Sequence, residues 1–111
     1  MSQNNLVRVR HALDAANKAI EFLKGKSRAD LAKNEMLSLA IVRLLEIVGE
    51  ASVGIDAEFR NQHPQIPWKE MTALRNRLIH GYFDINLDIV WKTVAEDLPP
   101  LANALEKLLD E

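Results

Sequence analysis

Several features that often decide a protein's class are missing from this 111-residue chain. It has no cysteine, which excludes a disulfide, a thiolate metal site and a cysteine nucleophile and suits a reducing compartment. Glycine and proline number four each, too few for a turn-rich all-β chain, and aromatic residues make up only 5%. No apolar run approaches the ~18 residues that span a bilayer, and the N-terminus lacks a signal-peptide core. We therefore expect a cytoplasmic protein that forms a single domain over residues 1–111.

Apolar residues recur at helical spacing in four stretches, and no stretch favours a strand. The pattern predicts an all-α, up-and-down bundle of four to five helices. Gly25 is expected to end the first helix, and Ser27 or Asp30 to cap the second. Pro99-Pro100 interrupts the last stripe, so we expect a kink there. The four stretches are residues 6–23, 37–59, 68–78 and 87–108.

The aromatic residues and two of the histidines have simple expected roles. Trp68 and Trp91 are in phase with the apolar stripes, so we expect both in the core. His63 precedes a proline and is expected in a loop, whereas His11 is on the charged side of the first helix and is expected in solvent.

The charged residues are distributed unevenly. The formal net charge of −2 excludes nucleic-acid binding by bulk positive charge. Residues 60–82, however, carry four Lys and Arg against one Glu, a net charge of +3, and hold His63 and His80. Residues 83–111 carry two basic against seven acidic side chains, a net charge of −5. An acidic chain therefore contains one basic, titratable segment.

The usual metal and phosphate motifs are missing. A di-iron site in a helical bundle needs Glu-x-x-His pairs, and this sequence has none. Three scattered histidines without cysteine do not favour zinc, and no glycine-rich phosphate loop is present. We expect no metal and no cofactor.

One segment, residues 71–82, combines side chains suited to phosphodiester chemistry. On a helical wheel, Asn76 and His80 fall about 100° and 140° from Arg75, so the three share one arc beside the core face. Thr72 falls on the same arc. Histidine transfers protons near neutral pH, and arginine holds phosphate oxygens in a fork of donors. Such a pair supports attack of a ribose 2′-OH on the adjacent phosphorus without a metal. The spacing alone is more typical of ordinary surface residues.

The sequence resembles the HepT-like branch of the HEPN superfamily over nearly its whole length. The residues that carry the resemblance are Ile47-Val48-Gly49-Glu50-Ala51, His63-Pro64-Gln65-Ile66-Pro67-Trp68 and Arg75-Asn76-Arg77-Leu78-Ile79-His80-Gly81-Tyr82. The last of these contains an Arg-x4-His-x-Tyr signature. The resemblance implies an α-helical bundle that forms a homodimer with a shared cleft, and a metal-independent endoribonuclease.

The family's roles transfer to matching residues of this chain. The resemblance implies that Arg75 binds the scissile phosphate, that His80 is the acid/base group and that Asn76 positions the RNA substrate. It also implies that Tyr82 is adenylylated by an MntA-type nucleotidyltransferase antitoxin, which adds bulk and negative charge beside the cleft. Arg77 and Glu50 are expected to support the site.

Two hypotheses follow. The first is a toxin ribonuclease of a HepT/MntA-type toxin–antitoxin system, active as a dimer that brings two basic segments together. The second is a non-catalytic helical adaptor that binds a nucleotidyltransferase through its basic segment. The joint presence of Arg75, Asn76, His80 and Tyr82 favours the ribonuclease.

Overall fold

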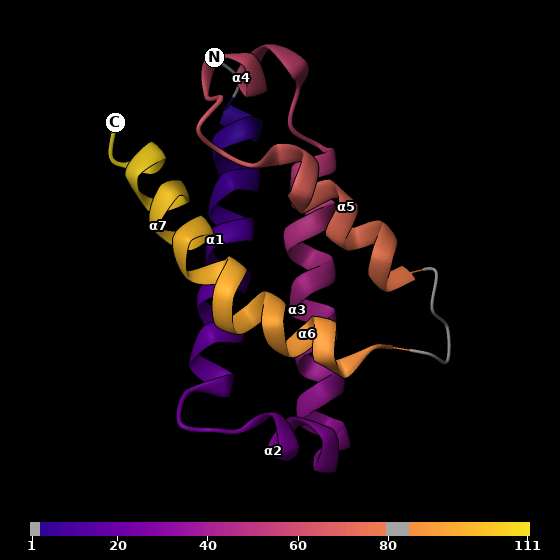
Figure 1. Ribbon diagram of the computed structural model, residues 1–111. Helices are drawn as coiled ribbons and strands as arrows, with labels where there is room; N and C mark the ends of the chain where they lie inside the picture. The colour runs from indigo at the N-terminus through magenta and orange to yellow at the C-terminus, as the bar shows by residue number, and fades with distance from the viewer. Residues whose placement is uncertain (1–2, 80–84) are drawn as a thin grey trace.

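Helices make up the fold, as the sequence predicts. The computed structural model describes residues 3–79 and 85–111, and these contain no strand. Long helices α1 and α3 lie side by side, α5 packs on α3, and the C-terminal helices cross the pair (Figure 1). None of the described helices is long and apolar enough to cross a membrane. The elements are α1 (Gln3–Leu23), α2 (Arg28–Lys33), α3 (Glu35–Val53), α4 (Ala57–Gln62), α5 (Trp68–Ile79), α6 (Leu87–Lys92), the π-helical turn η1 (Thr93–Asp97) and α7 (Leu98–Leu109).

Small side chains allow α1 to pack closely in the bundle. Four alanines of α1 are buried, and α1 has its most extensive packing with α3. Aliphatic residues fill the remaining core, with Leu45 of α3 and Leu105 of α7 fully buried. The low aromatic content is thus matched by an aliphatic core, in which each buried leucine contributes about 1.5–3 kcal/mol. The alanines are Ala12, Ala15, Ala16 and Ala19.

The chain between residues 28 and 62 is divided into three helices, whereas the sequence predicts one long stripe from 37 to 59. Ser27 begins α2 with a capping box that it shares with Asp30, as expected. Asn34 then caps α3 by accepting a hydrogen bond from the Leu37 N–H at 3.0 Å. The second break follows Gly54, where Asp56 accepts from the Phe59 N–H at 2.8 Å and starts α4. The apolar phase runs through this break and hides it from a periodicity analysis.

The interruption at Pro99-Pro100 takes the form of a π-helical turn. Chain direction continues from α6 through η1 into α7, and the Leu98 N–H donates to the carbonyl of Thr93, five residues earlier. A proline in a helix has no N–H to donate, and its ring collides with the carbonyl four residues earlier. The wider turn lies immediately before the prolines and relieves this collision.

The aromatic residues and histidines differ in part from expectation. Trp68 is in the core, as predicted, and its indole N–H donates to the carbonyl of His63 at 2.9 Å. His11 is exposed, also as predicted. His63 follows α4 in the expected loop but is buried, with its ring 4.5 Å from that of Phe59. Trp91 is only partly buried, so its prediction as a core residue was wrong in degree.

A buried asparagine joins the start of α1 to the start of α4. The side-chain amide of Asn5 donates to an Asp56 carboxylate oxygen at 2.8 Å, and its oxygen accepts from the Asp56 N–H at 3.2 Å. The hydrogen bond from Asn5, followed by that from the Phe59 N–H, lowers the pKa of Asp56 below its usual value of 3.8. The ionised carboxylate therefore holds the capped end of α4 against α1.

We predict that Asn5→Ala lowers the free energy of unfolding at pH 7. The variant's free energy of unfolding should also fall less than that of the wild type as the pH is lowered. Because the folded-state pKa of Asp56 is depressed, the stabilisation is fully present above about pH 4. It is lost as the pH falls through the lower folded-state pKa, and Asn5→Ala removes its largest cause. Urea unfolding between pH 2.5 and 7 measures the effect. Asn103→Ala, at an exposed position of α7, is the control, and equal acid dependence in both variants would contradict this assignment.

Candidate functional site

Helix α5 carries the first half of the signature segment, and a hydrogen bond fixes it to α3. The hydroxyls of Ser52 and Thr72 are 3.0 Å apart. The Ser52 hydroxyl is also 2.8 Å from the Gly49 carbonyl, to which it donates its single proton. Thr72 is therefore the donor to Ser52. Although the wheel places Thr72 on the polar arc, its hydroxyl is used to hold α5 in place.

Arg60 has a structural role at the end of α3. Its Nε donates to the Ile55 carbonyl at 3.2 Å, and its guanidinium also donates to the carbonyl of Ser52. These oxygens lie at the C-terminal end of α3, where carbonyls lack helical partners and a positive charge is favourable. One of the four cations that make residues 60–82 basic is therefore used within the fold.

The predicted site residues do not all lie on one surface. Asn76 is exposed on α5, and Arg75 is described only by its backbone position one residue earlier. Arg77 is exposed and lines a groove that Asn76 does not line. Glu50 is exposed on α3, where its carboxylate lies 3.5 Å from the guanidinium of Arg43. His80 and Tyr82 lie outside the described residues.

The two sides of α5 have different neighbours, which explains the separation of Arg77 from Asn76. Successive helical residues are about 100° apart, so Ala73 and Arg77, four residues apart, lie on one side. Both line the groove beside η1 and α7. Lys69 is exposed and is seven residues before Asn76, which places these two on the same side of α5. Lys69 is a cation near the signature that the sequence analysis did not single out.

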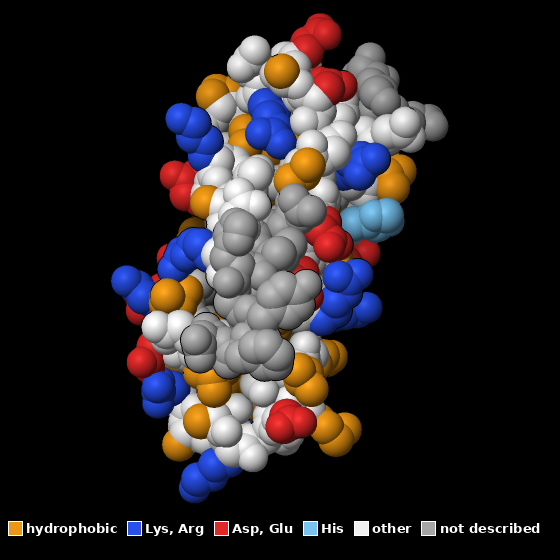
Figure 2. Space-filling view, turned by 90° about the vertical axis from the view of Figure 1, so that its right-hand side faces the viewer, with side chains coloured by type: hydrophobic (Ala, Val, Ile, Leu, Met, Phe, Trp, Pro, Cys, Tyr) orange, Lys and Arg blue, Asp and Glu red, His pale blue; other side chains and the backbone are white. Residues whose placement is uncertain are grey.

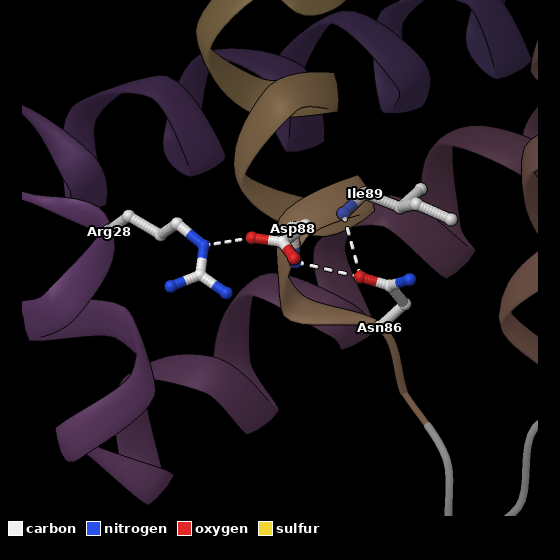
Figure 3. A network of polar contacts seen from close by, with 4 residues as sticks. All are labelled: Arg28, Asn86, Asp88 and Ile89. Carbon is white, nitrogen blue, oxygen red and sulfur yellow. Dashed lines mark hydrogen bonds and ion pairs between the residues drawn. The ribbon is translucent and has the colours of Figure 1, made fainter.

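The chain that follows the signature is fixed at the start of α6. The side-chain oxygen of Asn86 accepts from the Asp88 N–H at 2.9 Å and from the Ile89 N–H at 3.2 Å (Figure 3). The carboxylate of Asp88 forms an ion pair with Arg28 of α2. Both side chains are at least half exposed, so this pair contributes little to stability, but it ties α6 to α2. His80 and Tyr82 thus lie in sequence between two helices with defined anchors.

The described surface near α5 has no broad basic patch. Figure 2 views this side, and the coloured Lys and Arg side chains lie as separate groups among acidic and hydrophobic ones. Within residues 3–79 and 85–111, no group of three His, Asp or Glu side chains is placed to hold a metal ion.

Comparisons with known proteins agree with one another. A family model described as "Ribonuclease HepT-like" matches residues 12–108. A Methanocaldococcus jannaschii protein, provisionally named an RNase, is 46% identical over 94 residues, which cover 85% of this chain and 86% of the relative. A Thermococcus cleftensis protein named a probable ribonuclease HepT is 41% identical over 100 residues, covering 86% of this chain and 91% of the relative. No solved structure matched.

Proposed function

Since the chain belongs to the HepT-like ribonuclease family, we propose that it is the toxin of a toxin–antitoxin pair and cleaves RNA internally without a metal ion. The observation that carries this proposal is the match over residues 12–108, which includes the complete set of Arg75, Asn76, His80 and Tyr82. The relatives named as ribonucleases support RNA as the substrate.

The proposed reaction needs proton transfer and charge stabilisation only. A base removes the proton of a ribose 2′-OH, and the oxygen attacks the adjacent phosphorus. The bond from phosphorus to the 5′ oxygen breaks, and an acid protonates that leaving oxygen. The products are a 2′,3′-cyclic phosphate and a 5′-OH end. His80 is the proton-transfer group, Arg75 stabilises the phosphoryl charge, and Asn76 positions the RNA. Arg77 and Glu50 would act as supporting groups.

We predict that His80→Ala lowers RNA cleavage by about 10²-fold or more and leaves the helical fold intact, because general acid–base catalysis contributes that much. Arg75→Lys is expected to lose about a hundredfold, since an ammonium lacks the planar fork. Cleavage is measured with metal-free protein in chelator, and the product end is identified as a cyclic phosphate.

The controls are His11→Ala and Arg10→Lys, which change exposed residues of α1 in the same chemical way. Both should cleave at the wild-type rate. Full activity of His80→Ala would contradict the mechanism. Intact RNA at high wild-type protein concentration would instead support the non-catalytic adaptor.

Tyr82 is the proposed control point, at which a nucleotidyltransferase partner adds AMP. The added phosphate would lie two residues from His80 and repel the RNA backbone. After co-expression with such a partner, mass spectrometry should find AMP on Tyr82, and Tyr82→Phe should cleave RNA without restraint. Tyr82 is the single tyrosine of the chain, so modification on another residue type, or full control of Tyr82→Phe, would refute this assignment.

A homodimer is the proposed active form, and the open face of α1 and α3 supports it. Among the described residues, all the exposed large hydrophobic side chains lie on these two helices, including Met36 at 83% and Leu39 at 58% exposed. Exposed Leu39, Arg43, Glu50 and Val53 follow one another along α3 at helical spacing. The apolar residues stand at the two ends of this stripe, with the opposite charges between them.

This stripe is complementary to itself when two copies of α3 pack antiparallel. Its midpoint lies near residue 46, so Leu39 faces the partner's Val53 and Arg43 faces the partner's Glu50. A two-fold axis repeats each contact, as a symmetric dimer requires. Such a dimer would also bring two copies of α5 to the same assembly and add their basic segments together.

We predict that Arg43→Glu and Glu50→Arg each weaken the dimer at least about tenfold, because each places like charges opposite each other. An equimolar mixture of the two variants should restore it, since the heterodimer has complementary charges at both contacts. Sedimentation velocity measures the oligomeric state. The control pair Lys107→Glu and Glu106→Lys changes exposed residues of α7 and should have no effect. If Arg43 and Glu50 paired only within one chain, mixing the two variants would not restore the dimer. That result would reject this interface.

A further inference from the structure

The side of α5 that carries Arg77 borders an apolar groove of about 360 Å³. Its floor is formed by buried residues of four elements, among them Val48 of α3, Met71 of α5 and Leu98 of α7. Helix α5 packs mainly on α3, so its opposite flank remains separated from η1 and α7. The groove occupies that separation, above α3, between α5 and the C-terminal helices of Figure 1.

The rim of the groove is acidic. Glu70 of α5 and the adjacent Glu96 and Asp97 of η1 line it, against one cation, Arg77. All four are exposed, and within the described part of the chain none of them forms an ion pair. The rim thus combines three carboxylates that have no internal cation with an apolar floor.

Two prolines contribute rigid apolar rings to the lining of the groove. Pro67 precedes α5 and Pro100 lies in the first turn of α7, and both line the rim. A proline presents an apolar ring and no N–H, so these positions offer packing surface and no donor. Glu96 and Asp97, in the π-helical turn, line the groove from the C-terminal helices. The shape and chemistry therefore suit a chain segment that packs side chains inward and carries positive charge outward.

We propose that this groove binds a segment of a partner protein that has apolar side chains on one face and lysine or arginine beside them. The apolar side chains enter over Met71 and Leu98, and the flanking cations meet Glu70, Glu96 and Asp97. Burial of the apolar side chains supplies most of the affinity, since exposed ion pairs contribute little individually. The carboxylates select against acidic segments and against nucleic acid, because both carry the wrong charge.

Apart from Arg77, the groove shares no residue with the proposed catalytic set or with the proposed dimer stripe. Asn76 does not line the groove, and the stripe from Leu39 to Val53 is on the exposed face of α3, whereas the groove meets α3 at buried Val48. One molecule could accordingly hold RNA, a second copy and the partner segment together. Binding at the groove is therefore tested without reference to activity.

The test measures the fluorescence anisotropy of a labelled 14-residue amphipathic peptide of leucine and lysine, added to the full chain. We expect saturable binding that weakens as salt is raised. A serine and lysine peptide of the same charge should bind at least tenfold more weakly, and a leucine and glutamate peptide should not bind. Equal binding of the two lysine peptides would show attraction by charge alone and overturn the proposal, as would no saturation by the leucine and lysine peptide.

Variants locate the binding. Ala73→Arg places a long cation in the groove and should abolish binding, while its control, Ala32→Arg on exposed α2, should not. Glu96→Gln/Asp97→Asn should weaken binding about fivefold and reduce its salt dependence. The control double change, Glu58→Gln/Glu106→Gln, removes two exposed carboxylates outside the groove. Unchanged affinity of Ala73→Arg would place the peptide elsewhere and refute the groove as its site.

Discussion

The packing of α3 is the constraint on which the rest of the molecule depends. On one side α3 holds α1 through small buried side chains, and on another it holds α5 through apolar contacts and the hydroxyl pair of Ser52 and Thr72. Arg60 covers the carbonyls at its C-terminal end. The helix that carries the signature is thus positioned mainly by α3, with a further contact from Trp68 to the end of α4, so a displacement of α3 would be passed to Arg75 and Asn76.

The sequence predicts the helical class and most helix positions because burial imposes a period on apolar residues. It fails where local polar groups end a helix without disturbing that period. Asp56 is such a group, since it caps α4 while the apolar stripe continues to Phe59. Asn34, which lies just before the stripe, starts α3 in the same way and separates it from the short helix α2. The prolines correctly marked an irregularity in the last helix. Whether it is a π-helical turn depends on which carbonyl accepts from the Leu98 N–H, and the apolar periodicity does not reveal this acceptor.

The candidate site was predictable in part for a related reason. The period of a helix puts the consecutive residues Asn76 and Arg77 about 100° apart, in agreement with the groove, which Arg77 lines and Asn76 does not. Charge counting could not distinguish a free cation from Arg60, whose guanidinium donates to backbone carbonyls of the fold. Nor could it single out Glu96 and Asp97, because they approach Glu70 only when the C-terminal helices cross the bundle. The roles of His80 and Tyr82 rest on the family signature.

Helix α5 has a proposed ligand on each of its two open sides. A ligand that immobilises this helix, on either side, removes conformational freedom that a second ligand would otherwise have to remove. If either ligand restrains α5, the two binding equilibria are coupled through that helix. Thermodynamic reciprocity demands that a partner segment alter the affinity for RNA by the same factor as RNA alters the affinity for the segment. A helix with one main neighbour can thus link two binding sites, so that occupation of either site is felt at the other.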